Sequence, residues 1–264
     1  MPRNRACPAR RGGAVLTKQQ IDEFHREGFV LVPGLLEPAE QERYNARFLD
    51  IAQGDAPPEM TVMRDVMVVK GAVTPKTPVH GINKIMNLET DPILFDYARH
   101  PATLAIAAQL TGDQHLYTIS TNVFNKPPDI DGRHPLHQDL RYFRLRPASG
   151  IVGVWTALSP CTRESGCLAV IPRSHHGPLL GHGDPDWEYV NRAFYGVTDV
   201  DRDSRQHIEM APGDTLFFHP LLVHGSGRNR TNDFRRAISI HYASAECTTP
   251  GRDWKTGPHV RPVP

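Results

Sequence analysis

The chain has 264 residues, of which 39% are hydrophobic, and a formal net charge of +1 at pH 7. This length can bury a substantial core, and the balanced charge argues against a dedicated nucleic-acid-binding protein, which usually carries a strong basic excess. No apolar run approaches the roughly 20 residues that a membrane helix needs, and neither a secretory nor a peroxisomal signal is visible, so we expect a cytoplasmic protein without a membrane span.

The N-terminal region begins with a tail and continues with a capped helix. Residues 1–16 are rich in Arg, Pro and Gly, and we expect them to be disordered. Thr17 and Gln20 form a capping-box pattern, which predicts the start of a helix that Gly28 ends. The apolar run 29–32 then predicts a short buried strand.

Three further helices are predicted before residue 112. Pro38 suits the first turn of a helix, and helices are also expected near 91–99 and 102–111. The helix that follows Pro38 has an apolar stripe formed by Tyr44, Phe48, Ile51 and Ala52.

From about residue 114 the sequence changes to short β-like runs separated by Pro, Gly and Asp. Many short strands with turn signals between them indicate a sandwich or a barrel. We therefore predict one domain over residues 17–264, in which a helical layer (17–112) packs on a β-core (114–245). The predicted strands are 117–124, 151–158, 168–171, 215–218 and 236–242.

Two distant segments together suggest a metal site. In an extended strand, residues i and i+2 face the same side, so His137 and Asp139 can offer a nitrogen and an oxygen to one ion. His224 follows a later apolar strand. Two histidines and one carboxylate on one side of a metal are typical of non-haem Fe(II) oxygenases. The H-x-D pair alone is weak evidence, because a chain with 14 histidines contains such pairs by chance, and a polar loop is the alternative.

Arg235 is the second feature. Strand alternation places Arg235, Ala237 and Ser239 on one face and Arg236 on the other. A guanidinium beside small side chains can reach into a cavity and bind a carboxylate through two hydrogen bonds. The alternative is a surface arginine. The four cysteines form no CxxC pair, which favours reduced thiols over a zinc or disulfide framework.

Around these residues the sequence resembles the phytanoyl-CoA dioxygenase family, and the likeness extends over nearly the whole chain from about residue 17. The resembling stretches are NKPPD (125–129), RHPLHQDLRYF (133–143), WTAL (155–158), ESGCLAVIPRSHHG (164–177), GDTLFFHPLLVHGSGRN (213–229) and FRRAISIHYASAEC (234–247).

The resemblance implies a fold and a reaction. The fold is a double-stranded β-helix, a mainly β jelly-roll barrel of the cupin type with flanking helices. The resemblance also implies that His137, Asp139 and His224 are catalytic iron ligands. The reaction would use Fe(II), 2-oxoglutarate and O2, with ascorbate as a candidate reductant, and would couple release of succinate and CO2 to hydroxylation of an unactivated C–H bond.

The resemblance further implies a set of cosubstrate residues. Arg235 and Ser226 would bind the far carboxylate of 2-oxoglutarate, and Trp155 and Lys84 would line its site. Without the resemblance, Trp155 reads as core, Lys84 as a solvated charge and Ser226 as a turn residue. Two residues complete the set with weaker support. Gln138 is expected to face away from the metal, and Asn122 differs in residue type from the family at its position.

The expected substrate is a small molecule, a branched or long-chain fatty acyl-CoA hydroxylated at carbon 2. Rival readings are a dioxygenase of the same fold that acts on another small molecule, a non-catalytic binding protein and, more remotely, a metal-dependent hydrolase. The sequence does not predict the oligomeric state. Arginines near the metal motifs could meet the CoA phosphates: Arg133, Arg141, Arg144, Arg146, Arg228 and Arg230.

Overall fold

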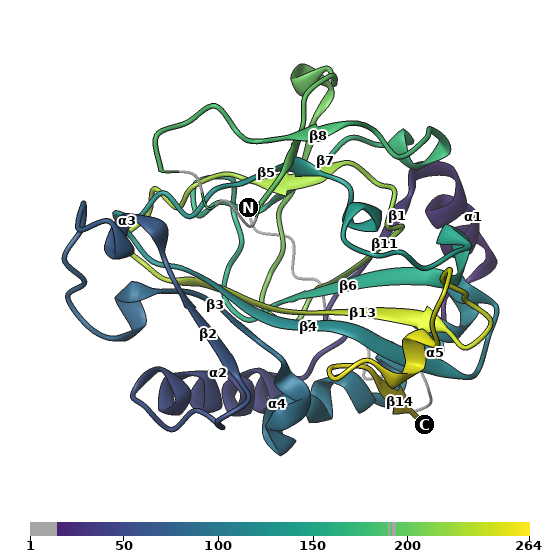
Figure 1. Ribbon diagram of the computed structural model, residues 1–264, viewed down its shortest axis with the longest axis horizontal. Coiled ribbons are helices and arrows are strands. Elements are labelled where there is room, and N and C mark those ends of the chain that lie inside the picture. Colours follow the sequence, from purple (N-terminus) through teal and green to yellow (C-terminus); the bar gives the residue numbers. More distant parts are fainter. Residues whose placement is uncertain (1–14, 190, 192–193) are drawn as a thin grey trace, which may run out of the picture.

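The computed structural model describes residues 15–189, 191 and 194–264, so nearly all of the tail predicted over residues 1–16 lies outside the described residues. Two antiparallel sheets face each other, and a layer of helices lies beneath the larger one (Figure 1). The small sheet has the order β10-β7-β12-β5, formed by Gln206–Ile208, Leu168–Val170, His224–Ser226 and His134–His137.

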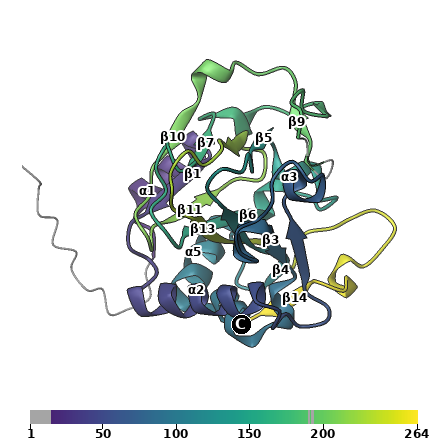
Figure 2. The ribbon, with the colours of Figure 1, turned by 90° about the vertical axis from the view of Figure 1, so that its left-hand side faces the viewer.

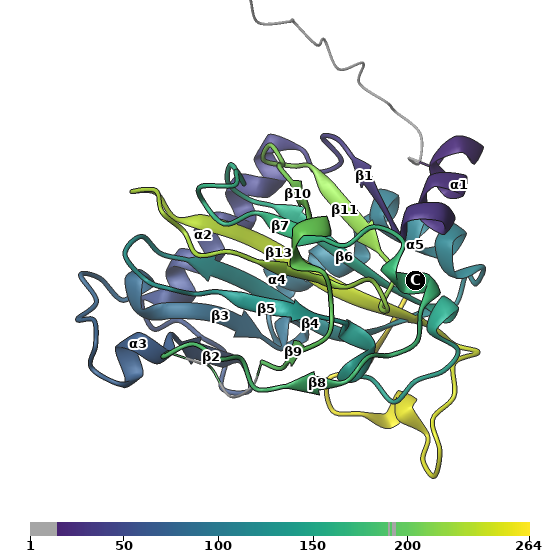
Figure 3. The same cartoon turned by 90° about the horizontal axis from the view of Figure 1, so that it is seen from above.

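The large sheet has the order β1-β11-β6-β13-β4-β3-β2, and β14 also pairs with β4. Figure 3 shows its strands side by side from above. Its strands are β1 (Phe29–Val32), β11 (Thr215–Phe218), β6 (Ile151–Ala157), β13 (Arg235–Ser244), β4 (Leu116–Lys126), β3 (Ile82–Met86), β2 (Thr61–Arg64) and β14 (Arg261–Val263). The two facing sheets confirm the predicted double-stranded β-helix.

Three helices cover the face of the large sheet that points away from the small sheet: α2 (Pro38–Ala52), α4 (Pro92–Phe95) and α5 (Pro101–Thr111) (Figures 1 and 2). The helix α1 (Lys18–Glu27) packs beside β1, and the short α3 (Val66–Val69) follows the end of β2. The predicted capping box is present in α1. Thr17 Oγ1 accepts a hydrogen bond from the Gln20 backbone N–H, and Gln20 Oε1 accepts one from the Thr17 backbone N–H. Gly28 ends this helix in the left-handed conformation, which glycine adopts without steric cost.

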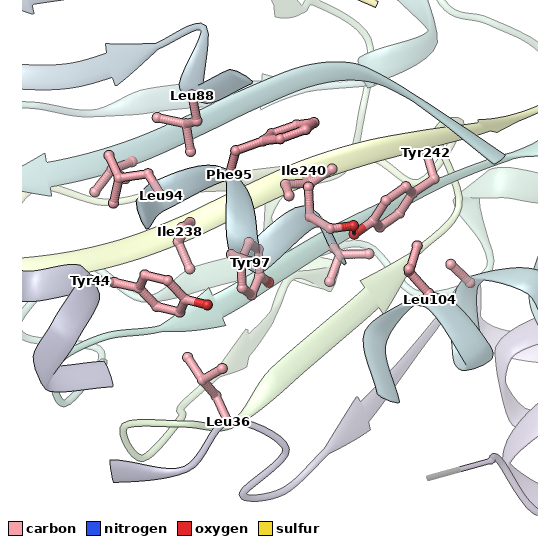
Figure 4. Close-up of a cluster of buried hydrophobic side chains, with 14 of the residues drawn as sticks. Leu36, Tyr44, Leu88, Leu94, Phe95, Tyr97, Leu104, Ile238, Ile240 and Tyr242 are labelled. Atoms are coloured by element: carbon pink, nitrogen blue, oxygen red, sulfur yellow. Dashed lines mark hydrogen bonds between the residues drawn. The ribbon is translucent and has the colours of Figure 1, made fainter. Parts of the chain in front are cut away.

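The main core lies between these helices and the large sheet. Alternation along β13 points Ile238, Ile240 and Tyr242 toward the helices, where they pack with Tyr44 and Tyr97 (Figure 4). The same alternation points the other set of β13 side chains into the space between the two sheets. The register of β13 therefore decides which residues belong to the core and which belong to the interior of the barrel.

The predicted elements are found within a few residues of their expected bounds, with two differences. The helix expected near 91–99 is α4 followed by a 3-10 turn, Asp96–Arg99. Among the elements that were not predicted are α3, β2, β3, β10, β12 and β14. Of these, β2 and β3 extend the large sheet from within the segment expected to be a helical layer. Their apolar residues do not alternate, because Val62 and Met63 are adjacent in β2, as are Ile85 and Met86 in β3. No helix in the described part of the chain is long and apolar enough to cross a bilayer.

A long excursion between β7 and β10 crosses the small sheet. It contains the short pair β8 (His182–Gly183) and β9 (Gly196–Val197), and β9 packs along β5. Phe194 of this excursion stacks against His134, with 3.9 Å between the ring centroids. The excursion therefore forms one wall near the interior of the barrel.

Candidate metal centre

His137, Asp139 and His224 lie together between the two sheets. Each offers one ligand atom, these atoms lie within 4.8 Å of one another, and all three residues are buried. His137 Nε2 is 3.1 Å from Asp139 Oδ1, and His224 Nε2 is 3.6 Å from Asp139 Oδ2. Two imidazoles and one carboxylate at this spacing can hold one metal ion from one side.

The backbone explains this convergence. His137 is the last residue of β5, Gln138 is extended, and Asp139 begins a 3-10 turn, so the carboxylate stands just beyond the strand end rather than within a strand. His224 pairs directly with His137 across the small sheet. A Cβ added at Gly225 would lie 2.8 Å from the Pro135 carbonyl oxygen, so glycine permits this close approach of β12 and β5.

The two histidines are held by the same kind of contact but differ in the direction of their pKa shifts. Their Nδ1 atoms face backbone carbonyl oxygens, Pro135 O for His137 and Leu222 O for His224, both within 2.9 Å, which leaves Nε2 free toward the centre. Burial lowers the pKa of His224 to about 4, so this imidazole is neutral and able to ligate near neutral pH. Burial also lowers the pKa of His137, but Asp139 offsets this and the net shift is upward.

His241 is a member of the site that the sequence analysis missed. Its Nε2 lies 2.6 Å from Asp139 Oδ2, so it can orient the carboxylate. The signal was present, because the alternation that places Arg235 and Ser239 on one face of β13 also places His241 there. Such a partner fixes a ligand's direction and is commonly as important as the ligand itself.

A cavity of about 310 Å³ extends from these residues into the barrel. Arg235 lines it and is only 2% exposed, and its Nε and one Nη nitrogen have no hydrogen-bond partner among the described residues. Its guanidinium lies 5.5 Å from the ring of Trp155, which lines the same cavity. A buried guanidinium without a partner is costly, and a carboxylate bound in the cavity would satisfy it.

Ser226 lines the cavity close to Arg235, and a buried lysine holds it. Lys126 Nζ donates to Ser226 Oγ at 2.7 Å and also to the Gly227 carbonyl oxygen. Lys126 and Arg235 are direct partners in the β4–β13 register. The sequence analysis missed the part that Lys126 plays here, although this residue stands in the resembling stretch NKPPD.

The remaining expected residues divide into two groups. Lys84 and Asn122 line the cavity, and burial lowers the pKa of Lys84 to about 8, with Asp139 opposing the shift. Gln138 does not line it. Its Nε2 donates to the Leu221 carbonyl oxygen at 2.8 Å and its Oε1 accepts from the Leu180 backbone, so it fastens the loop beside the small sheet.

Replacing Asp139 with Ala should leave some metal bound and abolish product formation. Two imidazoles remain, but the carboxylate charge and its part of the geometry are lost. Metal content and product are to be measured on the same preparation. Wild-type product formation would show that another carboxylate serves, and the sequence offers Glu209 and Asp214. Both carboxylates already accept hydrogen bonds elsewhere. Glu209 accepts from the Arg163 backbone N–H, and Asp214 accepts from the backbone N–H groups of Gly34 and Ala211.

Comparison with known proteins shows that this chain is similar to one family over most of its length. Residues 24–237 match the family model described as phytanoyl-CoA dioxygenase. The chain is 43% identical over 243 residues to a probable phytanoyl-CoA dioxygenase of Caenorhabditis elegans, covering 89% of this chain and 77% of the relative. It is 41% identical over 239 residues to the human peroxisomal phytanoyl-CoA dioxygenase, covering 88% of this chain and 70% of the relative.

Solved structures support the fold. EvdO2 of Micromonospora carbonacea in complex with 2-oxoglutarate superposes with a TM-score of 0.69 at 23% identity, covering 92% of this chain and 96% of that one. The carbocyclase SnoK of nogalamycin biosynthesis gives 0.69 at 19% identity, covering 94% and 97%. The family match covers most of the chain, and the chain therefore belongs to the phytanoyl-CoA dioxygenase family.

Proposed function

We propose that the chain hydroxylates carbon 2 of a branched or long-chain fatty acyl-CoA. It is an iron(II)- and 2-oxoglutarate-dependent dioxygenase of its family. One observation supports 2-oxoglutarate as the cosubstrate. The buried guanidinium of Arg235, two of whose nitrogens lack a partner among the described residues, lies in the same cavity as the two histidines and the aspartate. Release of succinate that requires both iron and 2-oxoglutarate tests this, and hydrolysis that continues without 2-oxoglutarate would instead favour a metal-dependent hydrolase.

Each residue of the site has a proposed part. His137, Asp139 and His224 would hold the iron, which supplies activation of O2 coupled to decarboxylation of the cosubstrate. Arg235 and Ser226 would bind the far carboxylate of 2-oxoglutarate, and Trp155 would pack against its carbon chain. Burial excludes water from these groups and strengthens their electrostatic interactions. Asn122 and Lys84 line the cavity, and we propose that they lie beside the cosubstrate.

The acyl-CoA assignment draws on two observations. The relatives at 41–43% identity are named phytanoyl-CoA dioxygenases. The cavity lining also includes apolar and aromatic side chains, which suit an alkyl chain: Met63, Met86, Tyr142, Phe143 and Phe194. The cytoplasmic location expected from the sequence is likewise a proposal. The human and rat relatives are named peroxisomal, and fractionation of cells that make the protein tests it.

The acyl-CoA assignment predicts a salt-dependent KM. Surface contacts to CoA phosphates weaken as the Debye length falls from about 10 Å at 0.1 M salt to about 3 Å at 1 M. The KM for an acyl-CoA should therefore rise with salt, and the free acid should be a much poorer substrate. Succinate release and hydroxylated product are to be compared for phytanoyl-CoA, a straight-chain acyl-CoA and both free acids. Equal turnover of ester and acid would move the assignment to another small molecule.

Replacing Lys126 with Met should raise the KM for 2-oxoglutarate and change kcat little. Lys126 Nζ donates to Ser226 Oγ, which leaves the hydroxyl hydrogen available for the cosubstrate carboxylate, and burial and the neighbouring Arg235 hold the pKa of this lysine well below its usual range. Losing a hydrogen bond to a charged group costs about 1.5–3 kcal/mol, roughly a tenfold to hundredfold loss of affinity. The Ser226→Ala variant should show the same change, and the double variant should add little to it. Additive losses would mean that the two side chains act separately.

A further inference from the structure

A second cavity, of about 530 Å³, lies against the small sheet. Cys167 and Ala169 line it, whereas Leu168 between them lines the cavity of the candidate metal centre. Since successive side chains of a strand point to opposite faces, the two cavities lie on opposite faces of β7. They meet at one end of the sheet, where His134 and Ser226 line both.

Positive charge is concentrated in this second cavity. Its charged lining consists of five arginines and two aspartates, a formal charge of 5 − 2 = +3, in a chain whose total is only +1. A concave surface of one sign focuses the field and attracts anions. The arginines come from four separate segments of the chain and converge only in the folded structure: Arg133, Arg163, Arg202, Arg205 and Arg230.

Most of these guanidinium groups have no carboxylate partner. Arg133 forms an ion pair with Asp131 and lies 4.5 Å from the ring of Trp187, which also lines the cavity. The side chains of Arg163 and Arg230 take part in no hydrogen bond or ion pair within the described ranges 15–189, 191 and 194–264. Their side chains are exposed, so their donors are available to a ligand.

We propose that this basic cavity binds the phosphates of the adenosine bisphosphate end of the acyl-CoA, an inference that rests on the proposed function. Guanidinium groups bind phosphate through paired hydrogen bonds, and the Trp187 ring offers a flat surface beside them. The metal-centre cavity of about 310 Å³ is at the small end of the range for ligand pockets, so it suits the cosubstrate and the reacting acyl end rather than a nucleotide. The shared end of the small sheet connects the two.

Direct binding tests the site without turnover. Adenosine 3′,5′-bisphosphate is titrated calorimetrically into the iron-loaded enzyme with 2-oxoglutarate present. The double variant Arg163→Gln/Arg230→Gln should weaken this binding about a hundredfold or more, because two charge-assisted contacts are lost and each is worth about tenfold or more. The control is Arg99→Gln, an exposed arginine next to the helical layer that lies outside this cavity. Unchanged binding in the double variant, or no binding by the wild type, would overturn the site.

Turnover separates the site from the proposed function. The double variant should raise the KM for phytanoyl-CoA but not for the corresponding acyl-pantetheine, which lacks the nucleotide. If phytanoyl-CoA is hydroxylated with an unchanged KM, the cavity is not the CoA site and the proposed function stands. If the bisphosphate binds to the cavity but does not compete with phytanoyl-CoA, the cavity is not the CoA site and serves a free phosphorylated ligand, and the proposed function again stands.

Discussion

Replacing either His137 or His224 with Ala should remove stable iron(II) binding and all product formation. Each substitution leaves one imidazole and one carboxylate at the ion, a weaker set than the two imidazoles that remain in the Asp139→Ala variant, and neither neighbouring imidazole is placed to substitute. His241 is already engaged with Asp139 Oδ2, and the ring of His134 stacks on Phe194. Iron stoichiometry after anaerobic reconstitution is the measurement, with succinate release as the second reading.

The matched control is His115→Ala, since this histidine is exposed and lies outside the cavity. It should keep full iron content and activity. Because His137 and His224 are buried, far-UV circular dichroism of each variant must show an intact fold before its iron content is read. Unchanged iron stoichiometry in a folded variant would remove that histidine from the proposed site.

Replacing Arg235 with Lys should raise the KM for 2-oxoglutarate about tenfold to a hundredfold. Lysine keeps the charge but loses the planar pair of donors that matches a carboxylate. One lost charge-assisted hydrogen bond costs about 1.5–3 kcal/mol. The Nε and Nη nitrogens that lack a partner within the described chain are the atoms at stake. Initial rates of succinate release against 2-oxoglutarate concentration, at saturating prime substrate, give the KM.

The neighbouring arginine provides the control for strand register. Arg236 faces the helical layer, where one Nη donates to Asn45 Oδ1 and the guanidinium lies 5.3 Å from the Phe48 ring. Arg236→Lys should therefore lower the melting temperature slightly and leave the KM for 2-oxoglutarate unchanged. If the two variants exchanged behaviour, the assignment of Arg235 to the interior of the barrel would be wrong.

Local sequence signals predicted most of the elements because each depends on nearby residues. The capping box at Thr17 and the glycine at residue 28 fix the first helix, and period-two alternation from Arg235 onward gives the two faces of β13. The same alternation extends to His241, which was overlooked because nothing local distinguishes it from other histidines. The strands β2 and β3 were missed because their apolar residues do not alternate, and no local pattern marks the pairing of β2 with β3 and of β3 with β4.

The sequence by itself identified the family through its motifs, and the resemblance to that family implied the jelly-roll fold, while spacing and residue type pointed to the candidate metal ligands. Only the tertiary structure decided what each side chain faces. It brought Lys126 to Ser226, separated by 100 positions in sequence, and His241 to Asp139, separated by 102. It also gathered five arginines at a second cavity. Contacts of this kind arise from strand pairing between distant segments, and a local pattern does not encode which partner a strand will meet.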